Sequence, residues 1–368
     1  MRITVDSKEF SAARQAAERY SGSSASPITQ CALLTVDEHG LSIRTTVFTE
    51  NCTIVVNQLG DEREDGEAVV MVKDLPRIDN GRVTLRTTKA RLILEYEQAK
   101  VQVNLRGENK SSFPVWPATE QIIAVPSSIL SAAASVTSKV EKSGRPITAA
   151  VHFIQHGELV AIMASDSIVS YMATVPGNIG RRIALNGAML SKALTMFGDC
   201  MVGICTNANG ASQVAELRSP TMPGVVYFSE METPDPSSWP SQMFGLETAG
   251  SMAVSSGVIS TILDWCRYAT GVSEDAQILL SGGLTAKIVG TGVDVDELTF
   301  EAEGQMEPPM AFFCKYFAAS FSGMRPTDKV TVSPLKDEAT LSKFIYMDGK
   351  DGDRHILPRC QGGFFEMP

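Results

Sequence analysis

His152 and His156 are the first residues whose spacing could support chemistry, because two imidazoles four residues apart on a helix can bind one metal ion. Their segment, 152–165, instead has the pattern of a hairpin with a glycine turn, and residues four apart on a strand lie about 13 Å from each other. Cys200 and Cys205 have no histidine nearby in the sequence. We therefore expect core or turn histidines, two buried thiols and no metal site.

Local motifs for catalysis are absent from the sequence. It contains no G-x-S-x-G, no phosphate-binding P-loop, no H-E-x-x-H and no G-x-G-x-x-G between a strand and a helix. Asp166 is a lone carboxylate at the end of a strand, where it is expected to fix a turn rather than to abstract a proton. The sequence thus predicts no catalytic residue, no cofactor and a protein that is not an enzyme.

Composition narrows the class of protein further. The chain has 368 residues, enough for two or three domains, with 43% hydrophobic and 20% charged residues. No apolar run is long enough to span a membrane, and the first residues do not resemble a secretory signal. Seven scattered cysteines are typical of buried thiols in a reducing cytoplasm. The net charge of −10 argues against nucleic-acid binding through a basic surface.

The elements that must position any site follow an order that recurs three times. A short apolar strand at 3–5, 123–125 and 252–254 is each time followed by a helix that opens on a Ser or Asp cap. A hairpin with a glycine turn comes next, at 33–46, 152–165 and 278–291. Helical spacing predicts one buried face for each of the first two helices: Phe10, Ala13, Ala17 and Tyr20 in the first, and Ile129, Ala132, Ala133, Val136 and Val140 in the second.

The second half of each copy also recurs. Helices are predicted at 183–198 and 311–324, with a shortened counterpart at 70–78 that Pro76 limits. Strands follow that begin near Val83, Val202 and Val330. We therefore predict an α+β chain of three similar domains, with boundaries at 1–119, 120–246 and 247–368.

Three ordered motifs give this repeat a family resemblance. The segment LVAIMASDSIVSYMATVP (159–176) is similar to a stretch with Ala-Thr-Asp in the bacterial DNA sliding clamp, the beta subunit of DNA polymerase III. TPDPSSWP (233–240) resembles the close of that family's middle domain, and HILPRC (355–360) resembles its end. The resemblance covers the whole chain and suggests a divergent or phage-encoded member.

The resemblance implies three DNA-clamp domains per chain, with helices lining a central hole and antiparallel sheets outside. Two chains would form a head-to-tail homodimer, a six-domain ring around double-stranded DNA. A ring needs no base readout, so an acidic chain with weak, sequence-independent phosphate contacts on its inner helices is consistent with it. The implied partners are DNA, the DNA polymerase, the clamp loader and other proteins with clamp-binding motifs; no membrane contact is implied.

Basic residues on the predicted helices are candidates for the DNA-facing surface. They are Arg14, Arg19, Lys139, Lys142, Arg145, Lys192, Arg267 and Lys315.

The family's second site is a pocket for short linear motifs of partner proteins, between the middle and last domains. The matching positions here are Thr148, Ser165, Ser167, Ile168, Val169, Ser170, Pro234, Trp239, Ile356, Leu357 and Pro358. An apolar groove of this kind accepts one or two anchors of an extended peptide. The family's Gly-His-Arg-Leu is replaced by 167–170, and the chain continues through 361–368, so partner specificity is expected to differ.

Two alternatives remain open from the sequence alone. One is a triplicated β-rich structural or binding protein without DNA contact. The other is a hydrolase whose residues converge from separate domains, which would have a deep polar cleft with perturbed acids.

Overall fold

The computed structural model describes residues 1–22, 26–47, 50–97, 99–108, 110–114, 119–137, 146–166, 169–205, 214–219, 224–238, 251–304, 306–321, 329–334, 343–348 and 354–358. The chain divides into two compact units. Unit 1 comprises Met1–Ile122 with Met196–Glu230, and unit 2 comprises Ile123–Thr195 with Met231–Pro368. Each unit is described by itself.

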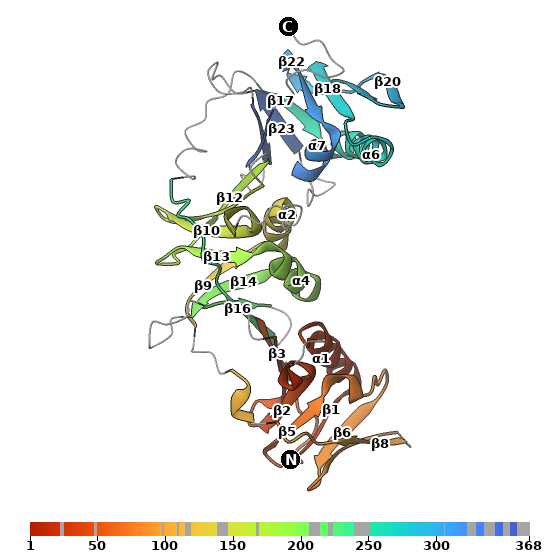
Figure 1. Ribbon diagram of the computed structural model, residues 1–368, viewed down its shortest axis with the longest axis vertical. Coiled ribbons are helices and arrows are strands. Elements are labelled where there is room, and N and C mark those ends of the chain that lie inside the picture. The colour runs from red at the N-terminus through yellow and green to blue at the C-terminus, as the bar shows by residue number, and fades with distance from the viewer. Residues whose placement is uncertain are drawn as a thin grey trace. The chain divides into compact units, whose positions relative to one another are not determined.

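Along the described chain, a strand followed by a helix opens three passages, each of which continues with further strands (Figure 1). The first passage contains β1 (Arg2–Asp6), α1 (Ser7–Arg19), η1 (Pro27–Gln30), β2 (Cys31–Asp37), β3 (Gly40–Thr46), β4 (Glu50–Val56), β5 (Gly66–Met71), η2 (Val72–Asp74), β6 (Arg82–Thr87), β7 (Arg91–Tyr96), β8 (Ala99–Asn104) and η3 (Lys110–Ser112).

The second passage contains β9 (Thr119–Val125), α2 (Ser127–Thr137), α3 (Pro146–Ala149), β10 (Ala150–His156), β11 (Leu159–Ser165), β12 (Ser170–Pro176), β13 (Ile183–Asn186), α4 (Gly187–Phe197), β14 (Cys200–Cys205), β15 (Val214–Arg218) and β16 (Gly224–Ser229). The third contains β17 (Met252–Ser255), α6 (Ser256–Val272), β18 (Gln277–Gly282), β19 (Thr285–Gly290), β20 (Val293–Thr299), β21 (Glu303–Gly304), β22 (Met306–Phe313), α7 (Cys314–Ser320), β23 (Lys329–Pro334), β24 (Lys343–Asp348) and β25 (Arg354–Pro358).

Each unit contains one large sheet and one four-stranded sheet. In unit 1 the strand orders are β5-β2-β3-β4-β16-β15-β14-β9 and β1-β6-β7-β8. In unit 2 they are β13-β10-β11-β12-β25-β24-β23-β17-β21 and β20-β19-β18-β22. The large sheets are continuous across the predicted repeats, because β4 pairs antiparallel with β16 and β12 pairs antiparallel with β25. Strands that would otherwise be sheet edges are thereby covered.

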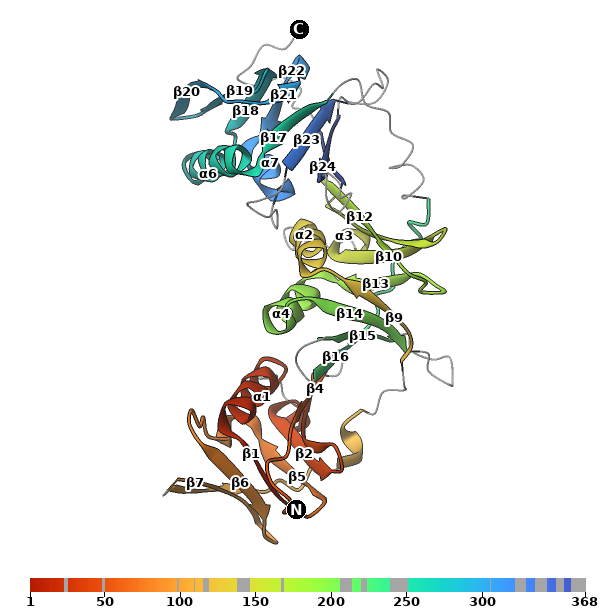
Figure 2. The same ribbon diagram turned by 180° about the vertical axis from the view of Figure 1, so that it is seen from behind.

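The helices pack on the sheets through the faces that their spacing predicts. On α1, which lies against β3 and β4 (Figures 1 and 2), Phe10, Ala13, Ala17 and Tyr20 are all buried. On α2, which lies against β10, β11 and β12, Ile129, Ala132, Ala133 and Val136 are buried, and Val140 lies outside the described residues. The α6 face that contains Ile259, Ile262, Leu263, Cys266 and Ala269 packs into a core with β18, β19 and α7. The buried faces predicted for the first two helices are confirmed for the described residues.

The second helices differ from their predicted bounds. α4 begins at Gly187 rather than at 183, because residues 183–186 pair with β10 as β13 and the Asn186 side chain caps the helix. Its Oδ1 accepts hydrogen bonds from the backbone N–H groups of Ala188 (2.9 Å) and Met189 (3.2 Å). α7 begins at Cys314 rather than at 311, because the preceding apolar residues continue β22 and pair with β18. In the first passage only the single turn η2 forms.

Candidate functional site

The helices differ in charge from the rest of the chain. Together α1, α2, α4, α6 and α7 contain six basic and three acidic residues, whereas the whole chain has a net charge of −10. The helices thus have a small positive balance, because acidic residues are rarer on them than in the rest of the chain. This is the distribution that the predicted DNA-facing surface requires, since phosphate contacts need local positive potential rather than a basic protein.

The two candidates on α1 have different environments. The Arg14 side chain is only 14% exposed: its Nε donates to the Leu75 carbonyl at 2.7 Å, and its Nη1 pairs with Glu18 at 3.0 Å. Arg14 therefore fixes α1 to the segment after η2, and its charge is compensated, so we remove it from the DNA-facing set. Arg19 ends the helix and is exposed.

Three further candidates lie on described helices. Lys192 on α4 is partly exposed. Arg267 on α6 is exposed and pairs with Asp264 at 2.6 Å, a surface pair of the kind that contributes little stability and can open toward another anion. Lys315 on α7 holds its ammonium 5.2 Å from the ring centre of Tyr316 and 5.8 Å from that of Phe313, within cation–π range. Lys139, Lys142 and Arg145 lie outside the described residues.

The first group of residues predicted for the peptide groove lies at the turn between β11 and β12. Ser165 and Ser170 face each other at the base of the turn, with their hydroxyl oxygens 2.9 Å apart. Asp166 accepts a hydrogen bond from the Val169 N–H at 2.6 Å and donates its own N–H to the Val169 carbonyl at 3.0 Å. The prediction that this carboxylate fixes a turn is confirmed. Ser167 and Ile168, at the tip, lie outside the described residues.

The second group of predicted groove residues comes from the far end of the chain. β25 pairs with β12 so that Ile356 lies directly opposite Ser170. Leu357 and Pro358 continue the same strand, which pairs on its other side with β24. Sheet pairing therefore brings together two groups of predicted groove residues that are nearly 190 positions apart in the sequence. Trp239 lies outside the described residues.

The interior behind the β11–β12 turn contains two more of the predicted groove residues and one of the two histidines expected in the core or a turn. Val169 is buried, as is Thr148 on α3, which lies against β11. His152 on β10 is fully buried, and its Nε2 lies 3.1 Å from the Ile147 carbonyl. Burial lowers the pKa of His152 to about 4, so the imidazole is neutral at pH 7. It is the core histidine that the strand pattern indicates.

Pro234 is exposed on a segment that one arginine holds in place. Arg182, just before β13, donates two hydrogen bonds to Thr233 and one to the Pro234 carbonyl. Sequence reasoning did not single out this residue. The contact spans 51 positions, and two adjacent arginines at the start of an apolar strand are its only signal in the sequence.

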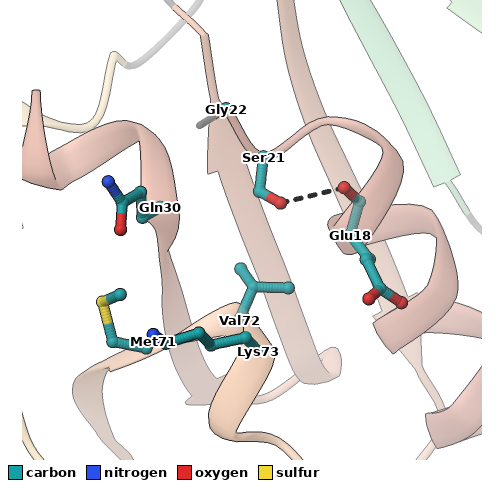
Figure 3. A pocket seen from close by; sticks show the side chains of 7 residues that line it. All are labelled: Glu18, Ser21, Gly22, Gln30, Met71, Val72 and Lys73. Carbon is teal, nitrogen blue, oxygen red and sulfur yellow. Dashed lines mark hydrogen bonds between the residues drawn. The ribbon is translucent and has the colours of Figure 1, made fainter. Parts of the chain in front are cut away.

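A pocket of about 360 Å³ opens in unit 1, apart from the predicted site residues (Figure 3). It lies between the end of α1, η1 and η2, and its lining residues are Glu18, Ser21, Gly22, Gln30, Met71, Val72 and Lys73. The Glu18 carboxylate already pairs with Arg14, and the Ser21 hydroxyl donates to the Glu18 carbonyl at 2.8 Å. Because its one acid is compensated, this pocket does not provide a general base.

Metal and thiol chemistry find no support in the described part of the chain. No group of three or more His, Cys, Asp or Glu side chains there could hold a metal ion. Cys31, Cys52, Cys200, Cys266 and Cys314 are buried free thiols, and burial raises the pKa of Cys200 to about 12. Across the same residues, none of the helices combines the length and apolar character needed to cross a membrane.

Comparison with known proteins finds similarity in structure but none in sequence. No family model matches the chain, and no curated protein is detectably similar in sequence. The structure, however, resembles the beta subunit of the DNA polymerase of Streptococcus pyogenes (TM-score 0.76, 12% identity) over 98% of this chain and 100% of that one. The same coverage is found for the DnaN sliding clamp of Pseudomonas aeruginosa bound to griselimycin (TM-score 0.76, 14% identity) and for the Helicobacter pylori beta clamp bound to a DNA ligase peptide (TM-score 0.73, 12% identity). From its first strand to its last, the chain has the fold of the bacterial DNA polymerase III beta subunit, the DNA sliding clamp.

Proposed function

We propose that this protein is a DNA sliding clamp, a processivity factor that encircles duplex DNA and tethers the replicative polymerase. The observation that carries the proposal is the likeness to sliding clamps over 98% of this chain and 100% of theirs, which leaves no part of the clamp fold unaccounted for. In this proposal the chain has three clamp domains, at 1–119, 120–246 and 247–368, acts in the cytoplasm and catalyses no reaction.

Contact with DNA falls to the helices. The described candidates for the surface of the hole are Arg19, Lys192, Arg267 and Lys315, and the basic residues at 139–145 are further candidates. A few weakly held cations suit a sliding protein, because each tight phosphate contact would have to break at every step along the duplex. Acidic strands and loops outside would repel DNA and disfavour binding anywhere but the hole.

Ring closure by a second copy is supported by the charge of two strand edges. β8 and β20 each end a four-stranded sheet and have a strand partner on one side only among the described residues. Residues 82–104, from β6 to β8, contain five basic and two acidic residues; residues 284–304, around β19 and β20, contain one basic and five acidic. Pairing β8 of one chain with β20 of the other would cover both edges and bring opposite charges together. A head-to-tail contact of this kind closes into a ring.

Partner proteins would bind at the groove between the β11–β12 turn and β25. Clamps of this fold have been solved with a DNA ligase peptide and with griselimycin, and we infer that an extended peptide of a polymerase, a clamp loader or a repair protein binds here. Ser170 stands where the resembled family has leucine, so a small hydroxyl group replaces a large apolar side chain, and the preferred anchor is expected to differ from that of the common bacterial clamps.

A direct test of the ring is the mass of the protein in solution, measured by light scattering against the 39.6 kDa chain. The proposal predicts a mass near twice the chain at micromolar concentration. A chain that remains a monomer in the presence of DNA and clamp loader would instead favour a triplicated binding protein without DNA contact.

A further inference from the structure

Arg182 makes a fork of contacts with a segment 51 residues further along the chain. Its Nη1 donates to the Pro234 carbonyl at 2.7 Å and to the Thr233 hydroxyl at 3.1 Å, and its Nη2 donates to the Thr233 carbonyl at 3.2 Å. Nη1 also lies 4.0 Å from a carboxylate oxygen of Asp235, and the arginine side chain is only 29% exposed. The planar guanidinium thus fixes two consecutive residues through three hydrogen bonds.

The loop that precedes Arg182, between β12 and β13, is tied to β10 by one side chain. Gln155 Nε2 donates to the Gly177 carbonyl at 3.3 Å, and Gln155 Oε1 accepts from the Ile179 N–H at 3.0 Å. The Arg181 side chain donates to the Arg182 carbonyl at 3.0 Å. Gly177 has a φ of +148°, and a Cβ there would lie 2.6 Å from the Ile123 side chain, so the turn depends on glycine. The base from which the arginine extends is therefore fixed.

Among the described residues, the segment that Arg182 holds has few backbone hydrogen bonds to its sheet, although Pro236 is buried. Residues 231–238 form no strand, although they run past β13, the first strand of its sheet. One backbone hydrogen bond, from the Met231 N–H to the Ala184 carbonyl at 2.9 Å, ties the segment to that strand. Pro234 and Pro236 have no N–H to donate to a ladder. The side chain of Arg182 supplies the fixation that sheet pairing cannot.

We propose that Arg182 is a positioning residue of the peptide groove: it holds residues 233–235, and with them Pro234, in the conformation that receives a partner peptide. The inference rests on the proposed function, because Pro234 belongs to the groove only if the chain binds peptides as a clamp. Asp235 extends the same fixed path, since its carboxylate accepts a hydrogen bond from the Ser237 N–H at 3.0 Å and another from the Ser237 hydroxyl.

The test compares Arg182→Gln and Arg182→Lys with the wild type in the full chain. The probe is a fluorescein-labelled peptide with the clamp-binding segment of the replicative polymerase from the same genome, and its Kd is measured by fluorescence anisotropy. We expect Arg182→Gln to weaken binding about tenfold, corresponding to about 1.4 kcal/mol. Arg182→Lys should recover part of the loss, because lysine keeps the charge but not the fork. Lys8→Gln removes one positive charge from the exposed start of α1, outside these contacts, and should stay within about twofold of the wild type.

Two further readouts separate positioning from a general loss of stability. Hydrogen exchange at residues 231–238 should accelerate in Arg182→Gln without peptide, while the mass in solution stays that of the wild type. In double-mutant cycles with alanine-substituted peptides, at least one peptide position should couple to Arg182. Equal affinity of Arg182→Gln and wild type, or a loss that couples to no peptide position, would overturn the role of Arg182 alone. A wild-type chain that binds no partner peptide would overturn the proposed clamp function itself.

Discussion

Gly187 is the first residue of α4 and lies against the end of α2, where there is no room for a side chain. A Cβ added there would overlap the Thr137 Oγ1 and lie 2.7 Å from the Thr137 Cβ. Thr137 ends α2, is 1% exposed and donates its hydroxyl to the Ala134 carbonyl at 2.8 Å, so it cannot turn away. We predict that Gly187→Ala forces the start of α4 away from the end of α2.

The expected cost follows from overpacking, which typically destabilises a core by about 1–3 kcal/mol. The ordinary gain from replacing glycine by alanine in a helix, about 0.5–1 kcal/mol, offsets part of it. We therefore expect Gly187→Ala to lower the thermal midpoint, measured by circular dichroism, by about 5 °C. Gly257→Ala is the matched control: Gly257 lies in the first turn of α6 with no atom within 4 Å of the added Cβ, so stability should be unchanged or slightly higher.

A substitution at Thr137 tests whether this side chain causes the loss of stability. Thr137→Ala removes the overlapping oxygen and leaves only the contact between the two Cβ atoms, so it should recover about half of the loss in the Gly187→Ala background, a coupling of about 1 kcal/mol. A Gly187→Ala protein as stable as the wild type would refute the packing argument. So would a Thr137→Ala effect that is the same in both backgrounds.

Three other predictions concern a buried base, a strand edge and a turn. Burial lowers the folded-state pKa of His152 to about 4, so as the pH falls the unfolded chain takes up this proton before the folded chain does. The free energy of unfolding from urea titrations should therefore keep its full value above about pH 6.5 and be lower by about 2 kcal/mol at pH 5. If His152→Gln loses the same free energy between these two pH values, the reasoning is wrong. Glu297→Lys on β20 removes a negative charge from the proposed interface, so the dimer dissociation constant from sedimentation should rise about tenfold in low salt and less in high salt. Glu274→Lys makes the same charge change away from that edge and should leave the dissociation constant unchanged. Equal effects of the two variants would count against the charge-matched interface. Asp166→Ala should cost about 1 kcal/mol of stability and weaken peptide binding, while Asp166→Asn keeps an acceptor oxygen and should stay near the wild type; two equally damaged variants would contradict the turn's role.

Local features were predictable from the sequence, because their signals lie within one turn or one hairpin. The spacing of Phe10 and Tyr20 specifies the buried face of α1, and the carboxylate at Asp166 specifies a turn. The start of α7 was not predictable in this way. Residues 311–313 are apolar and fit a helix or a strand equally well, and their pairing with β18, more than 30 positions earlier, decides for the strand.

The residues of the predicted groove also fall into a part that local sequence predicts and a part that it does not. The hairpin containing Ser165 and Ser170 follows from local pattern, whereas the position of Ile356 opposite Ser170 depends on pairing between the second and third passages. Before the structure, only the family resemblance connected them. The contact of Arg182 with residues 233–234 could not be predicted either. Two adjacent arginines mark the place in the sequence, but a guanidinium that bonds to distant backbone carbonyls leaves no spacing pattern.

Topological retention on DNA tests the central claim most directly. The protein, labelled with a fluorophore, would be loaded by the clamp loader and ATP onto a nicked circular plasmid, separated from free protein by gel filtration, and followed before and after a restriction enzyme linearises the plasmid. A ring that slides without tight phosphate contacts should stay on the circle and leave once an end is available, at a rate that salt changes little. Equal retention on circular and linear DNA would show binding by contact rather than by enclosure, and would contradict the clamp.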